Sequence, residues 1–138
     1  MAIEYFDVSE DWVVQANYQP FETPILQEIE NILGFTSIDT IYGTLAFEID
    51  NQSYNLWPLM GANSMFIMFA DETSGVSTYG SGRFLSAPLP DANNKVKIDF
   101  NKAYNPPCAF SDYATCPLPP LNNILPIEGN AGERTCRQ

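Results

Sequence analysis

The chain is organised around one stretch, Asp99–Pro120, which reads DFNKAYNPPCAFSDYATCPLPP. It contains five of the eleven prolines and two of the three cysteines. Because proline fixes φ and lacks a backbone donor, this stretch cannot form an inner strand or a helix interior. Its four aromatic residues carry too much apolar surface for a solvated tail: Phe100, Tyr104, Phe110 and Tyr113. We therefore expect an ordered, proline-stiffened loop laid over the domain, with any functional site beside it.

The residues before this loop predict strands. Segments 44–50 and 95–100 alternate apolar with polar or charged residues, which is typical of half-buried strands. Asp50-Asn51 is turn chemistry, and 53–57 is the expected hairpin partner of 44–50. The apolar run 65–70 does not alternate, so we expect a strand covered on both faces.

The remaining segments complete a mainly β prediction. Further strands are expected at 12–18, 36–42 and 124–127, with a turn between Pro20 and Pro24. Segment 25–33 fits either a helix ended by Gly34 or a strand, and its β surroundings favour the strand. About seven to nine short strands without crossover helices indicate an antiparallel β-barrel or sandwich, with less than about a fifth of the residues helical. We expect residues 1–138 to form a single β-rich domain.

Several motifs resemble an uncharacterised prokaryotic family, domain of unknown function 1684. They are YGSGRFL at 79–85, DFNKAYNPPCAF at 99–110 and YATCPLPP at 113–120. The segments 43–47 and 71–75 fit the same family. The resemblance extends over roughly residues 42–133, and it implies that this chain corresponds to the C-terminal part of a longer family architecture. It implies no established activity, cofactor or catalytic residue.

Charge and composition exclude several partners. The net charge is −11, and residues 1–82 carry twelve Asp or Glu but no Lys or Arg. Such a chain repels nucleic acid and anionic membranes, and we interpret the acidity as a solvated surface. No targeting segment is visible, and the run 65–70 is too short to cross a bilayer. The sequence thus predicts a soluble protein with a small-molecule or protein partner. Its odd cysteine count slightly favours the cytoplasm, although an exported protein whose signal had been removed would look the same.

Cys108 and Cys116 are expected to be structural. The chain has no histidine and only one further cysteine, so a zinc site lacks ligands, and we expect no metal or cofactor. As a nucleophile, Cys108 would need activation by Lys102 or Asp112. Two buried thiols or one loop disulfide remain as the structural alternatives. We expect the two cysteines to lie near each other, because a loop of this length packed on one face brings its ends together.

Six residues are candidates for a ligand site at the strand ends: Tyr79, Arg83, Asn101, Lys102, Tyr104 and Asn105. Arg83 is the first basic residue, and it follows a glycine-rich turn. It fits either an anionic ligand or an internal ion pair, for which the nearby acids are Asp71, Glu72 and Asp99.

The roles of the other candidates also stay open. The asparagines fit either a pocket rim or caps on backbone groups that the loop leaves unpaired. For Arg83 we expect burial, with the guanidinium facing the segment from Asp99 to Asn105.

Three functions remain open. The sequence favours a non-enzymatic ligand-binding or accessory module. Its apolar pocket would be rimmed by Tyr79, Arg83, Asn101, Tyr104 and Asn105. The second is a hydrolase or isomerase without histidine, which would use Asp99 or Asp112 with Lys102 and Tyr104. The third is a protein-interaction domain that docks through the loop 99–120.

Overall fold

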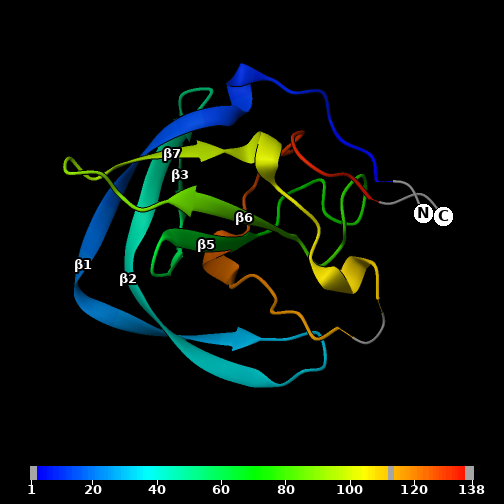
Figure 1. Cartoon of the computed structure of the whole chain (residues 1–138), viewed down its shortest axis with the longest axis horizontal. Helices are drawn as coiled ribbons and strands as arrows, with labels where there is room; N and C mark the ends of the chain where they lie inside the picture. The colour runs from blue at the N-terminus through cyan, green and yellow to red at the C-terminus, as the bar shows by residue number, and fades with distance from the viewer. Residues whose placement is uncertain (1–2, 112–113, 136–138) are drawn as a thin grey trace.

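Two antiparallel β-sheets make up the domain in the computed structural model, which describes residues 3–111 and 114–135 (Figure 1). The larger sheet has the order β3-β2-β1-β7, with β1 (Val13–Glu30), β2 (Thr36–Ile49), β3 (Gln52–Leu56) and β7 (Lys95–Asp99). The smaller sheet has the order β4-β5-β6, with β4 (Leu59–Met60), β5 (Ser64–Phe69) and β6 (Arg83–Pro88). The described residues form no α-helix, only the short 3₁₀ turns η1 (Glu10–Trp12), η2 (Phe100–Lys102), η3 (Pro107–Ala109) and η4 (Leu121–Asn123). The predicted mainly β, antiparallel architecture is confirmed.

Strands β1 and β2 form a long ribbon that bends sharply along its length (Figure 1). Pro20 pairs with Gly43, but the next pair is Ile25 with Ile41, so β1 uses five positions where β2 uses two. Extra residues on one strand curve it, and proline fits where the ladder is interrupted because it has no N–H to contribute. The predicted turn between Pro20 and Pro24 is therefore wrong. One strand bends there and continues to Glu30, which confirms the strand interpretation for 25–30, and a turn follows at 32–33.

The core lies between the two sheets, with Phe100 near its centre. The Phe100 ring centroid lies 5.8 Å from that of Trp12, 5.8 Å from that of Phe47 and 5.6 Å from that of Phe69. Strand β5 is covered on both faces, as its apolar run predicts, because both odd and even positions are buried: Met65, Ile67, Met68 and Phe69. Phe100 is the second residue of the proline-rich stretch, so this stretch begins inside the core.

The rest of that stretch crosses to the far end of the β1–β2 ribbon. Cys108 and Cys116 form a disulfide with their Cα atoms 6.1 Å apart, which confirms their predicted proximity and selects the disulfide from the two structural alternatives. Beyond it, Leu118 N donates to Glu30 O at 2.7 Å, and Ile32 N donates to Cys116 O at 3.2 Å. The loop is therefore held on the tip of the ribbon, where Figure 1 shows the orange segment beside the cyan hairpin. Asp112 and Tyr113 lie outside the described residues.

The expected edge strand at 124–127 does not form. Only a single parallel bridge joins Ala70 to Ile124 there. Two features prevent a longer ladder: η4 immediately precedes Ile124, and Pro126 has no N–H to donate.

Candidate functional site

Arg83 lies at the centre of a closed polar cluster. Its side chain is 2% exposed, and Nη2 donates to Asp71 Oδ2 at 3.1 Å and to Gly129 O at 3.0 Å. Nη1 donates to the carbonyl oxygens of Ala131 and Glu133. Burial lowers the pKa of Arg83, and the carboxylates of Asp71 and Glu133 oppose that shift. Arg83 thus forms an internal ion pair with Asp71, one of the three acids considered from the sequence.

The predicted burial of Arg83 is confirmed, but its predicted direction is wrong. The guanidinium faces residues 129–133, whose carbonyl groups at alternate positions point to it. That segment lies between Arg83 and the residues that follow β7. Glu133 N donates to Ala103 O at 2.9 Å, and Asn105 N donates to Glu133 Oε1 at 2.9 Å. Nothing in the spacing of residues 129–133 indicated that they return to this place.

The two predicted asparagines bind backbone groups. Asn101 Oδ1 accepts from Ser9 N at 3.1 Å, and its Nδ2 donates to Ser9 O at 2.8 Å. Asn105 Nδ2 donates to Arg134 O at 3.0 Å, while its buried Oδ1 has no hydrogen-bond partner among the described residues. Asn101 therefore fixes the segment that leads into η1.

The other predicted residues do not gather around one cavity. The Tyr104 ring packs edge-on against Phe84, with ring centroids 5.9 Å apart. Lys102 is exposed, and Tyr79 is half-buried. Binding of a ligand by these residues and by Arg83 stays a prediction, since the hollows described next are lined by other residues.

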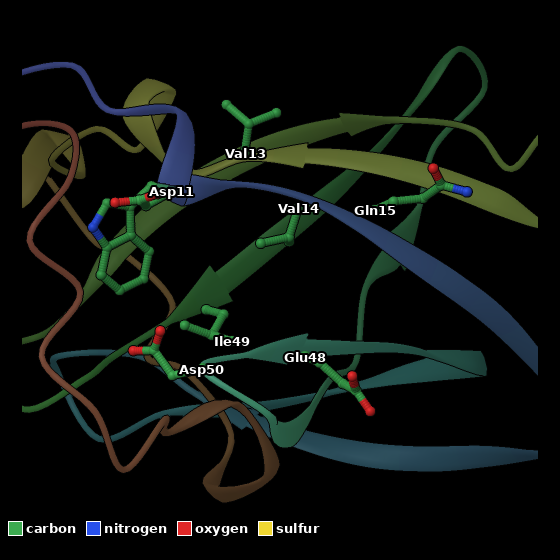
Figure 2. Close-up of a pocket in the computed structure, with 8 residues that line it drawn as sticks. Asp11, Val13, Val14, Gln15, Glu48, Ile49 and Asp50 are labelled. Atoms are coloured by element: carbon green, nitrogen blue, oxygen red, sulfur yellow. The ribbon is translucent and has the colours of Figure 1, made fainter.

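A groove opens where the β1–β2 ladder ends. The last pair on this side is Asn17 with Ala46. Beyond it β1 continues only with β7, up to the pair Val13–Asp99, and β2 continues only with β3, up to the pair Ile49–Gln52. The strands separate, and a groove of about 550 Å³ lies between Asp11–Gln15 and Glu48–Asp50. Figure 2 shows Val14 and Ile49 reaching into it from its two walls.

Two neighbouring hollows continue this groove on either side. One of about 430 Å³ shares Gln15 and Glu48 with it and adds Tyr54. The other, of about 410 Å³, shares Trp12, Ile49 and Asp50 and extends to Ile127. The opening therefore passes from the outer face of the sheet to the side that faces the core. We call these three hollows together the acidic groove.

The acidic groove combines an apolar floor with a negative rim. The floor side chains pack against the core and are partly buried: Trp12, Val14, Ile49, Tyr54 and Ile127. The rim carries five exposed carboxylates: Asp11, Glu48, Asp50, Glu72 and Glu128. Within the part of the chain that the structure describes, none of the five has an ion-pair partner, and no Lys or Arg lines the groove. These carboxylates therefore leave the potential of the groove negative.

Local structure places these groups. Ser9 Oγ accepts from Asp11 N at 3.2 Å and caps η1, so Asn101, which holds Ser9, indirectly positions the end of the groove. On the other wall, Asp50 and Asn51 have φ values of 51° and 64°. Such values are those of a two-residue hairpin turn, which sets Asp50 at the end of β2. The sequence predicts only a solvated surface for these acids, and the absence of bases from residues 1–82 is its one signal for the groove.

The groups considered for catalysis either form hydrogen bonds within the fold or do not lie around a common cavity. Asp99 Oδ1 accepts from Asn101 N at 3.0 Å and from Asn101 Nδ2 at 2.9 Å, so it caps η2. Among the described residues, no group of three or more acidic or cysteine side chains could hold a metal ion. In the same part of the chain, no helix is long and apolar enough to cross a membrane.

Comparisons with known proteins place the chain among proteins without an assigned activity. A family model described as "Protein of unknown function (DUF1684)" matches residues 1–134. The match thus includes the N-terminal strand as well as the part from Tyr42 onward. Among solved structures, the solution NMR structure of an uncharacterized protein from Haloarcula marismortui is 34% identical, with a TM-score of 0.76 over 96% of this chain and 76% of that one. No curated protein matches the chain.

Proposed function

The chain belongs to the DUF1684 family, and we propose that it is a small non-enzymatic binding module whose site is the acidic groove. One observation carries the proposal. The ladder between β1 and β2 stops at Asn17–Ala46 and leaves a groove with an apolar floor and with carboxylates that form no ion pair among the described residues. Pockets with apolar walls and a few converging polar groups are the usual form of a ligand site.

The chemistry of the groove selects a ligand with positive charge and some apolar surface. Five carboxylates that have no ion-pair partner in the part of the chain that the structure describes attract a cation. A carboxylate that the ligand partly covers interacts with the cation more strongly than it would in open water. Trp12 and Tyr54 offer ring surfaces on which an ammonium or guanidinium group can rest. An anionic ligand is repelled by the same rim.

The alternative functions have less support. A hydrolase or isomerase would use Asp99 or Asp112 with Lys102 and Tyr104. Asp99 Oδ1 already accepts two hydrogen bonds from Asn101, and Asp112 lies outside the described residues. A docking role for the loop 99–120 would need a free loop surface. Its C-terminal part is held on the ribbon by bonds to Glu30 and Ile32, whereas Tyr104 and Phe110 are exposed.

Titration with two simple cations tests the proposed site. Spermine supplies charge alone, and 4-phenylbutylammonium supplies charge with an apolar ring. We expect both to bind saturably and to weaken as salt is added. In the double variant Glu48→Gln/Asp50→Asn, spermine affinity should fall by about tenfold, the equivalent of 1.4 kcal/mol.

A matched control is available on the same ribbon. Glu28 and Glu30 are exposed acids of β1 that do not line the acidic groove. The variant Glu28→Gln/Glu30→Gln removes the same charge and should leave both affinities nearly unchanged. Equal losses in the two double variants would mean that only net charge matters, and the proposed site would be wrong.

A further inference from the structure

We infer that the ligand of the acidic groove is an extended basic peptide segment of a partner protein, which enters between β1 and β2 as an additional strand. This inference rests on the proposed function and specifies its partner. It is carried by the backbone of the two groove walls rather than by the acidic side chains.

The first wall is a strand edge with open backbone groups. In an antiparallel strand, N–H and C=O of one residue point to the same neighbour, and those of the next residue point to the other. Tyr18 N donates to Asn94 O at 2.7 Å, on the β7 side. Counting back in twos, Val14 also faces β7, whereas Asn17 and Gln15 face β2. Asn17 is opposite Ala46, but no residue of β2 pairs with Gln15.

The second wall has the same property. Ile49 pairs with Gln52 across the two-residue turn, so its backbone groups face β3. Glu48, the neighbouring residue, therefore faces β1. Gln15 and Glu48 would be the next rung after Asn17–Ala46, yet the two strands have separated there. Donors and acceptors thus face the groove from both walls, and a strand is the ligand that satisfies both.

The walls also set the length and pattern of the guest. Each wall is three residues long, Val13–Gln15 on one side and Glu48–Asp50 on the other. This length matches a guest of about three residues at roughly 3.3 Å per residue. Side chains of a guest strand alternate between the two faces of the sheet. One face presents Val14 and Ile49, which pack against the core, and the other presents the exposed Gln15 and Glu48. The complementary pattern is basic–apolar–basic.

Strand β7 shows that β1 accepts this pattern. It lies on the opposite edge of β1 and reads Lys95-Val96-Lys97-Ile98. Val96 and Ile98 are buried in the core, and Lys95 Nζ donates to Asn17 Oδ1 on the outer face. A guest with the same alternation would find apolar contacts on the core side and, on the outer face, Glu48, which forms no ion pair with any described residue.

The test uses the peptide acetyl-Lys-Val-Lys-Ile-Lys-amide and two analogues of identical side chains. In one analogue the backbone nitrogens of the three lysines are methylated, and in the other those of valine and isoleucine. A strand held on both edges uses both sets of N–H groups, so each analogue should bind at least about tenfold more weakly. Hydrogen exchange gives a second readout: the amides of Gln15 and Glu48 should slow by tenfold or more when the parent peptide is bound, while Val14 serves as the control that is already paired with β7.

The outcomes separate the inference from the proposed function. Loss of affinity in both analogues, with new protection at Gln15 and Glu48, supports strand insertion. Equal binding of all three peptides, alongside binding of spermine, overturns strand insertion and leaves the cation-binding groove intact. If neither the peptides nor spermine bind, the proposed function fails as well.

Discussion

The Arg83 cluster and the acidic groove are two polar regions with opposite fates. Around Arg83, every partner is present: one carboxylate and three backbone carbonyls surround a guanidinium that is 2% exposed. Around the groove, carboxylates and strand edges lack partners among the described residues. Polar groups whose partners lie within the fold contribute to stability, whereas those left without partners are available for recognition. The comparison thus assigns structure to the first region and binding to the second.

The largest expected effect tests the closed region. Replacing Arg83 with alanine leaves Asp71 and the three carbonyl groups buried without their donor, and should cost about 3–5 kcal/mol of unfolding free energy. Arg83→Lys should also destabilise, because one ammonium group cannot reach all four acceptors. Chemical denaturation of both variants, with the exposed Lys102→Ala as control, measures this. An unchanged midpoint for Arg83→Ala would contradict the structural role.

The second-largest effect tests whether loss of a buried neutral side chain that has its hydrogen-bond partners within the fold also lowers stability. Asn123 is fully buried, and it accepts from Trp57 N at 2.7 Å and donates to Trp57 O at 2.9 Å and Met68 O at 2.8 Å. Its replacement with alanine leaves three backbone groups without a partner and should cost roughly 2–4 kcal/mol. The adjacent Asn122 is exposed, so Asn122→Ala is the matched control. Equal melting temperatures for the two variants would mean that the hydrogen bonds of Asn123 do not stabilise the fold.

The smallest effect belongs to the open region. Because Glu48 and Asp50 have no ion-pair partner among the described residues, neutralising them breaks no ion pair of that part of the chain. We expect Glu48→Gln/Asp50→Asn to change the unfolding free energy by less than about 0.5 kcal/mol, while it lowers cation affinity. Denaturation at low salt, where charge effects are greatest, checks this. A loss of 2 kcal/mol or more, as roughly expected of a buried group, would mean that these acids support the fold instead.

Local pattern predicted most of the strands. Alternation at 44–50 and 95–100 and the Asp50-Asn51 turn correspond to β2, β7 and the β2–β3 hairpin. Those signals reside in neighbouring residues, so a sequence contains them directly. The bend at Pro20 to Ile25 was missed because proline punctuation indicates a break in the ladder but not whether the chain reverses or only curves.

The site was predictable only in part. The burial of Arg83 and its pairing with an acid followed from the charge distribution, but its carbonyl partners lie 46 to 50 positions away along the chain. The acidic groove depends on where β1 and β2 cease to pair, which is set by how each strand continues with a different neighbour. No single segment contains that information. Six candidate residues were therefore chosen at the strand ends beside the loop, while the groove formed elsewhere.

The distance between Arg83 and its carbonyl partners also has a consequence for synthesis. Residues 129–133 are synthesised 46 to 50 positions after Arg83, which takes roughly 2 to 10 s at usual rates of translation. During that interval the guanidinium must remain hydrated, because burial without the carbonyl groups would be too costly. Closure of the core around β6 therefore waits for the end of this segment. A nascent chain interrupted before Gly129 would lack all three carbonyl acceptors, so the packing around Arg83 depends on residues that are made long after it.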